Sequence, residues 1–121
     1  MTNRKGPRFE RLVADFLVDE GFMAADRKVK TGARDKGDIA GIPDWTIETK
    51  DLAKVDLAGL VDEATVEAAN ARTTWFAGIQ KRRRKNVRDA YVVMPLWLFA
   101  RLLRRLLAIP DPVCEHCGKA A

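Results

Sequence analysis

Residues 37–51, GDIAGIPDWTIETKD, contain the strand–turn–strand pattern from which we infer the fold of this 121-residue chain. From residue 45 to residue 50, side chains of two kinds alternate, which is typical of a β-strand: Trp45, Ile47 and Thr49 on one side, Thr46, Glu48 and Lys50 on the other. Ile39 marks a preceding strand, and the Gly41-Ile42-Pro43-Asp44 segment between them reads as a turn. We expect two neighbouring strands joined through that turn.

The same stretch contains charged residues that could form a metal site. Asp38 and Glu48 stand equally far from Pro43 in the turn, which makes them approximate cross-strand neighbours at roughly 5 Å between Cβ atoms. Lys50 shares the strand face of Glu48. Adjacent carboxylates repel unless a cation lies between them, and Mg²⁺ prefers oxygen ligands. The pattern predicts a metal site; the alternative is a set of exposed residues with a cross-strand salt bridge, since Glu-x-Lys is common by chance.

The spacing of apolar residues along the rest of the chain predicts a mixed α/β fold. We expect helices over residues 7–20, 57–72 and 96–107, and further strands over residues 22–29, 73–79 and 91–94. The order is α-β-β-β-α-β-β-α, with helices packed on a mixed central sheet. The first helix places Glu10 at the rim of the core and turns Arg11 away. Residues 1–109 form one domain, and residues 110–121 a flexible tail.

The positive charge of the chain is concentrated. The formal net charge is +5, and residues 81–88, KRRRKNVR, contain no acid. A polyanion such as DNA is the partner that this pattern favours, because each neutralised phosphate releases counterions; a solvated loop that aids solubility is the alternative. The candidate DNA-binding residues are Arg4, Lys5, Arg8, Arg34, Lys36, Lys81, Arg82, Arg83, Arg84 and Lys85.

Other function classes find little support in the sequence. No stretch approaches the ~20 apolar residues that span a bilayer, and the first residues lack a signal-peptide pattern, so we expect a cytoplasmic, intracellular protein without membrane contact. We expect no small-molecule cofactor. Cys114, His116 and Cys117 in the tail could hold part of a zinc site, but tetrahedral zinc needs four ligands.

Glu10, then Gly37-Asp38-Ile39, then Ile47-Glu48-Thr49-Lys50 together resemble the PD-(D/E)XK nuclease superfamily, and most closely its small Holliday junction resolvases from archaea and phages. The resemblance covers residues 6–107 and includes the opening helix around Glu10. The chain departs from the family pattern at Gly37, where many members have proline, and in its Cys-containing tail.

The resemblance implies a restriction-endonuclease-like core and Mg²⁺-dependent cleavage of branched DNA by a homodimer, with Mn²⁺ able to substitute. Carried over by position, Asp38 and Glu48 become metal ligands, Lys50 the catalytic lysine, Glu10 the helix carboxylate, and the Thr49 backbone carbonyl a further ligand. A flap or restriction-type nuclease and a non-catalytic DNA-binding module remain open alternatives. The helix over 96–107 and the Trp75/Phe76 strand are candidates for a dimer surface or for the core.

Overall fold

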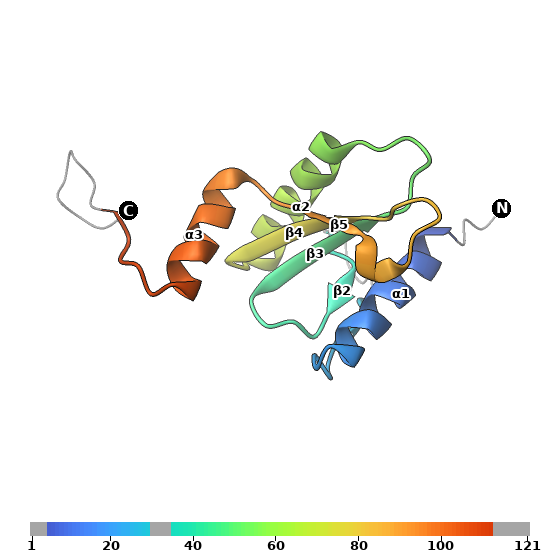
Figure 1. The fold of residues 1–121 in the computed structure, drawn as a ribbon, viewed down its shortest axis with the longest axis horizontal. Coiled ribbons are helices and arrows are strands. Elements are labelled where there is room, and N and C mark those ends of the chain that lie inside the picture. Colours follow the sequence, from blue (N-terminus) through green and yellow to red (C-terminus); the bar gives the residue numbers. More distant parts are fainter. Residues whose placement is uncertain (1–4, 30–34, 113–121) are drawn as a thin grey trace.

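The computed structural model describes residues 5–29 and 35–112. The elements, in chain order, are α1 (Lys5–Asp19), β1 (Asp26–Arg27), β2 (Ile39–Ala40), β3 (Trp45–Lys50), α2 (Leu57–Ala71), β4 (Trp75–Gln80), the 3-10 helix η1 (Val87–Asp89), β5 (Tyr91–Val93) and α3 (Leu96–Leu106). The mixed α/β class expected from the sequence is confirmed (Figure 1). Arg4, Arg34 and the Cys114–Cys117 segment lie outside the described residues, as does the side chain of Lys5.

The described strands form two sheets rather than the one central sheet that we expected. β3 and β4 pair in parallel, from Trp45 opposite Trp75 to Lys50 opposite Gln80, and β5 adds an antiparallel edge to β4. Two parallel neighbours need a crossover connection, which α2 supplies. β1 and β2 form a separate antiparallel pair. A backbone hydrogen bond of 2.8 Å from Asp38 N to Ile47 O ties this pair to β3.

The small pair is short because the backbone bends on both sides of it. β2 lies between Gly37 and Gly41, which have φ angles of 101° and 87°, a region that glycine enters without steric cost. A Cβ at Gly41 would lie 1.8 Å from the carbonyl oxygen of Ala24, so the chain passes the turn before β1 too closely for any other residue. The strand expected over 22–29 is reduced to β1, because Phe22 and Ala25 lie in hydrogen-bonded turns that follow α1.

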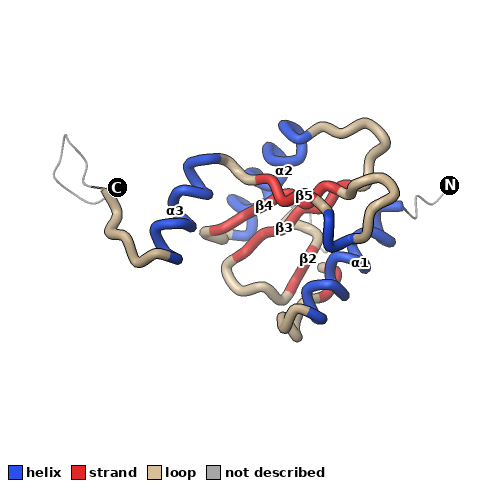
Figure 2. Tube along the Cα trace, viewed as in Figure 1, coloured by secondary structure: helices blue, strands red, loops and turns tan. Residues whose placement is uncertain are grey.

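Helices α1 and α2 cover opposite faces of the β3-β4 pair (Figure 2). Ile47 and Ile79 pack with Phe9 and Val13 of α1. On the other face, Phe76 packs with Ala64 and Ala68 of α2, and a Cβ at Gly78 would lie 2.3 Å from Leu60 Cγ. Since side chains alternate along a strand, Glu48, Lys50 and Gln80 belong to the α2 face.

The buried stripe of α1 is rotated relative to the expected one. Phe9, Glu10, Val13 and Ala14 are buried, whereas Leu12 is 41% exposed. The apolar spacing of the sequence predicts a stripe of Phe9, Leu12, Val13, Phe16 and Leu17, with Glu10 at its edge. In the structure Glu10 is buried, paired with Arg27 of β1, and Leu12 lies outside.

Helix α3 lies at the end of the molecule away from α1 (Figure 1) and packs through Leu98 on the core cluster that contains Phe76. Leu98 is its one buried residue, while Leu96, Trp97, Phe99, Leu103 and Leu106 are exposed. Trp75 and Phe76, the other candidate dimer surface, belong to the core. None of the helices within the described residues has the length and apolar content to cross a bilayer.

Candidate metal centre

Asp38 lies against the outer edge of β3, held there by Thr49. Its side chain is 3% exposed, and its Oδ2 accepts hydrogen bonds from Thr49 N at 2.8 Å and Thr49 Oγ1 at 3.2 Å. The backbone of Asp38 bonds to Ile47 rather than to Glu48, so the register is shifted from the expected one, although the Asp38 carboxyl lies within hydrogen-bond reach of the Glu48 side chain as well as of Thr49. In addition to its expected carbonyl role, Thr49 orients the carboxylate through its N–H and its hydroxyl.

Gly37 stands where the PD-(D/E)XK pattern has proline, and its backbone conformation is one that proline cannot adopt. Its φ of 101° is closed to proline, whose ring fixes φ near −65°. A Cβ at this position would also lie 3.0 Å from Thr46 Cγ2 and 3.2 Å from the carbonyl oxygen of Ile47. The glycine lets the backbone approach β3 closely enough for Asp38 to bond with Thr49.

Glu48 projects from β3 toward α2 into a group of carboxylates. It is 4% exposed. Burial, together with hydrogen bonds and repulsion from Asp38 and Glu67, raises its pKa to about 12. Burial likewise raises the pKa of Glu67 to about 7, although the hydrogen bond from Glu48 acts in the opposite direction. The proton therefore resides on Glu48, and the group carries fewer negative charges at neutral pH than it has carboxyls.

Lys50 points to the same face and is already paired. Its Nζ lies 2.8 Å from Glu63 Oε2 of α2. Partial burial lowers the pKa of Lys50, but the bond to Glu63 and the charges of Glu48 and Asp38 outweigh it, and the pKa is raised. Lys50 is therefore a permanent cation beside the buried carboxylates.

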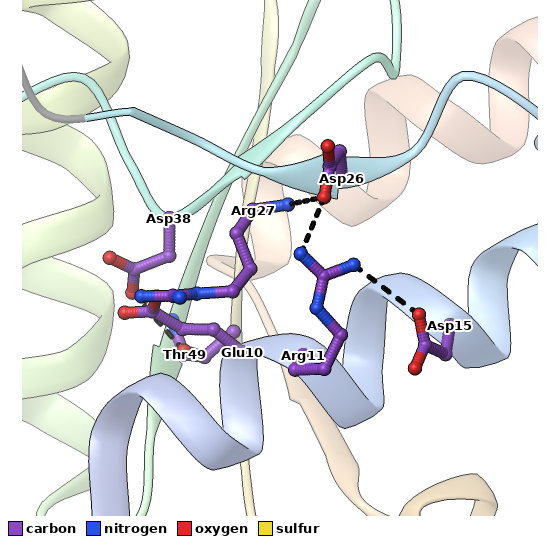
Figure 3. A network of polar contacts seen from close by, with 7 residues as sticks. All are labelled: Glu10, Arg11, Asp15, Asp26, Arg27, Asp38 and Thr49. Carbon is purple, nitrogen blue, oxygen red and sulfur yellow. Dashed lines mark hydrogen bonds and ion pairs between the residues drawn. The ribbon is translucent and has the colours of Figure 1, made fainter. Parts of the chain in front are cut away.

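Glu10 reaches the same region from α1 and is paired with an arginine. Its Oε2 lies 3.0 Å from Arg27 Nε, and Figure 3 shows Arg27 extending from β1 over Glu10, with Asp38 and Thr49 beyond. Arg11 points outward to Asp26 at 2.7 Å and Asp15 at 3.4 Å. Arg11 points outward as the helix periodicity predicts, whereas Glu10, which we expected at the rim of the core, is buried.

The basic run begins at the edge of the sheet where the carboxylates lie. Because β3 and β4 are parallel, both end there: Lys81 N donates to Lys50 O at 2.9 Å, and Lys81 Nζ lies 3.5 Å from Asp51. Arg82 lies over the ring of Tyr91, 4.6 Å from its centroid.

The rest of the basic run is open to solvent. Arg83, Arg84 and Lys85 are exposed. A pocket of ≈ 190 Å³ is lined by Asp51, Leu52, Ala53, Val55, Lys81, Arg83 and Arg84. Arg8 and Lys36 are also exposed, but lie on α1 and on the loop before β2.

Four residues of this centre escaped the sequence analysis: Asp35, Glu63, Glu67 and Arg27. Glu67 had a usable signal, because it interrupts the apolar stripe of a helix expected to pack on the sheet. Asp35, Glu48 and Glu67 each offer a carboxylate oxygen within 4.8 Å of the others. The expected metal set of Glu10, Asp38, Glu48 and Thr49 thus shares only Glu48 with the tightest group of carboxylates among the described residues.

Comparison of the chain with protein-family models, with curated proteins and with solved structures found no match in any of the three. The resemblance to PD-(D/E)XK nucleases stays a prediction.

Proposed function

We propose that the protein is a Mg²⁺-dependent DNA endonuclease of the PD-(D/E)XK type, acting on branched DNA and in particular on four-way junctions. Asp38 and Glu48 serve as metal ligands, together with Glu10 and the backbone carbonyl of Thr49, and Lys50 is the catalytic lysine. The observation that supports this most directly is the buried pair Asp38 and Glu48 beside a charged lysine, at the sheet edge where the basic run begins.

The donor set fits a hard divalent cation. Carboxylate oxygens are the ligands that Mg²⁺ and Mn²⁺ prefer. Burial raises the pKa of Glu48, and the repulsion of the neighbouring Asp38 and Glu67 carboxyls raises it further. A divalent cation removes that repulsion. When bound, such an ion polarises a phosphoryl oxygen and lowers the pKa of a coordinated water.

The protein's own residues would hold and polarise the scissile phosphate. Lys50 stands on the same strand face as Glu48, so its ammonium group can neutralise charge that develops on the phosphate oxygens. Glu63 keeps that ammonium group charged and in place. Thr49 fixes the direction of the Asp38 carboxylate through two hydrogen bonds.

DNA binding is assigned to the basic run. Arg83, Arg84 and Lys85 are exposed in the loop that follows β4, and the pocket between Asp51 and Arg84 has the lysine and arginine lining that suits a phosphate. Contacts of this kind read the position of the backbone rather than base sequence. They suit an enzyme that selects DNA by its shape.

The proposal is tested by incubating the protein with a four-way junction, a flap, a linear duplex and single-stranded DNA at one salt concentration. We expect cleavage in Mg²⁺ that EDTA abolishes, and the fastest cleavage on the junction. Faster cutting of the flap or the duplex would reassign the substrate to a flap or restriction-type nuclease. Tight binding of DNA with no cleavage in Mg²⁺ or Mn²⁺ would contradict the enzyme and leave a DNA-binding module.

A further inference from the structure

We propose that Asp35, Glu48 and Glu67 hold a divalent cation of their own, on the α2 side of Glu48. The inference deepens the proposed function, because Glu48 belongs to this group and to the Asp38 site, and would face an ion on either side. It assigns ligand roles to Asp35 and Glu67, which the motif does not include.

The three carboxylates are brought together by separate parts of the chain. Glu48 comes from β3, Glu67 from the third turn of α2 and Asp35 from the loop before β2, and their oxygens lie within 4.8 Å of one another. Asn70, one turn after Glu67 on α2, donates through Nδ2 to the backbone carbonyl of Asp35 at 2.9 Å. The Gly37 N–H donates to Asp35 Oδ1 at 3.0 Å. The loop is therefore fastened to the helix that carries Glu67.

Glu67 supplies an independent sign that a ligand is needed. Its side chain is 4% exposed, and within the described part of the chain its Oε2 is buried without a hydrogen-bond partner. A buried carboxylate oxygen without a donor is costly, and such atoms point to an ion or a water. Lys50 Nζ bonds to Glu63 at 2.8 Å and Asn70 Nδ2 to the Asp35 carbonyl, and neither bonds to Glu67 Oε2.

A pocket gives an ion access to this group. It has a volume of ≈ 310 Å³ and is lined by Asp35, Asp62, Glu63, Val66, Glu67 and Asn70. Four of these six residues are acidic, in a chain whose net charge is +5. The lining contains no histidine or cysteine, so oxygen-seeking ions such as Mg²⁺, Mn²⁺ or Ca²⁺ fit it better than zinc. Mg²⁺ keeps several of its waters in sites of this kind, and the pocket leaves room for them.

The test counts Mn²⁺ ions bound to the full chain by electron paramagnetic resonance, supported by calorimetric titration. The wild type should bind one ion at the Asp38 side and another at Glu67. Glu67→Gln keeps the size of the side chain and should lose one ion per chain, whereas Asp62→Asn, which removes an acid from the same pocket but not from the group, should lose none. Binding of a single ion by the wild type, or an unchanged count in Glu67→Gln, would overturn the inference.

Cleavage assays on the same samples separate this inference from the proposed function. If Asp38→Asn loses one ion and all cleavage while Glu67→Gln keeps both ions, the nuclease stands and the second site does not. If no variant or wild-type sample cuts any DNA, yet Glu67→Gln loses an ion, the second site stands and the nuclease does not.

Discussion

Thr49 binds one oxygen of Asp38 twice, through its backbone N–H at 2.8 Å and its hydroxyl at 3.2 Å. Both bonds end on Oδ2, so they fix the rotation of the carboxylate as well as its position. Glu48, which precedes Thr49 in β3, projects from the other face of the strand, toward α2. A single strand thus orients one carboxylate from its edge and contributes another itself.

The first prediction concerns these two carboxylates. Asp38→Asn and Glu48→Gln should each abolish Mg²⁺-dependent cleavage, because each removes an anionic ligand, while DNA binding stays within a few-fold since no phosphate contact is lost. The checks are single-turnover cleavage rates and binding isotherms at equal salt. Asp19→Asn, an exposed acid at the end of α1, is the control and should cut normally. Near-normal cutting by both site variants would refute the site.

The second prediction separates Lys50 from its partner Glu63. Lys50→Ala should lower the cleavage rate by ~10²-fold or more, because a cation next to developing charge is lost, yet retain Mn²⁺ binding. Glu63→Gln leaves the lysine in place but removes the main group that raises its pKa. It should cost only a few-fold in rate. An equal loss in the two variants would mean that the ion pair, rather than the lysine charge, matters.

The positions of several residues of the metal centre could be predicted from the local sequence pattern, whereas those of other residues could not. Strand alternation placed Glu48 and Lys50 on one face, and helix periodicity placed Glu10 at the rim of the core, since both depend only on neighbouring residues. Glu67 could not be assigned a place, because its contact with Glu48 depends on the crossover of α2 and its register on the sheet. The partner of Glu10 was missed for the same reason: Arg27 lies on a two-residue strand that exists only because Gly37 and Gly41 shape the chain around it.

Helix α3 shows a second kind of structural information that sequence periodicity does not contain. Its apolar spacing is as regular as that of a core helix, yet only Leu98 is buried. Periodicity indicates that a face needs a partner and does not identify the partner, which can belong to the same chain or to another.

The third prediction is that stability of the metal-free protein falls as pH rises. The pKa of Glu67 is raised from 4.5 to about 7 on folding, so its contribution to stability is complete below its unfolded pKa and is lost as pH rises through about 7. In EDTA, the melting temperature should fall by several degrees between about pH 5 and about pH 8. Excess Mg²⁺ should flatten the curve by replacing the proton.

The control for this pH effect is Glu67→Gln, which is neutral at every pH. In EDTA its melting curve should be shallower between those two pH values, with the slope due to Glu48 remaining because its pKa is also raised. Asp62→Asn should keep the wild-type slope. Calorimetric melts across the range provide the measurement. A flat curve for the metal-free wild type would show that the carboxyl group titrates as in the unfolded chain.

The fourth prediction addresses the basic run. Changing Arg83, Arg84 and Lys85 together to Ala should weaken binding to all DNA forms about equally, and flatten the dependence of log K on log salt by up to ~3 units. Arg82 is left in place because its stacking on Tyr91 and its bond to the Asp89 carbonyl make it part of the fold. Arg72→Gln, which removes an exposed cation at the C-terminal end of α2, is the control and should keep the wild-type slope. Equal salt slopes for the wild type and the loop variant would make the run a solubility feature.

The last prediction is that the protein is a symmetric homodimer formed through α3. Leu96, Phe99, Leu103 and Leu106 recur at helical spacing and are exposed. A two-fold axis across this stripe would set each chain's α3 against the other's, a self-complementary contact. Each chain carries one Asp38–Glu48–Lys50 centre, and resolving a four-way junction takes paired nicks, so a second copy must provide the second centre.

Leu103→Glu with Leu106→Glu should give a monomer by light scattering, because an apolar contact cannot hold two buried charges. The monomer should still nick linear duplex in Mg²⁺ but lose its preference for the junction, since the fixed spacing of two centres is gone. Leu12→Glu, on the exposed side of α1, should remain dimeric. If the wild type is itself a monomer at micromolar concentration and cuts duplex as fast as a junction, the resolvase proposal fails. The metal-dependent nuclease would survive that result, because its ligands and its lysine all come from one chain.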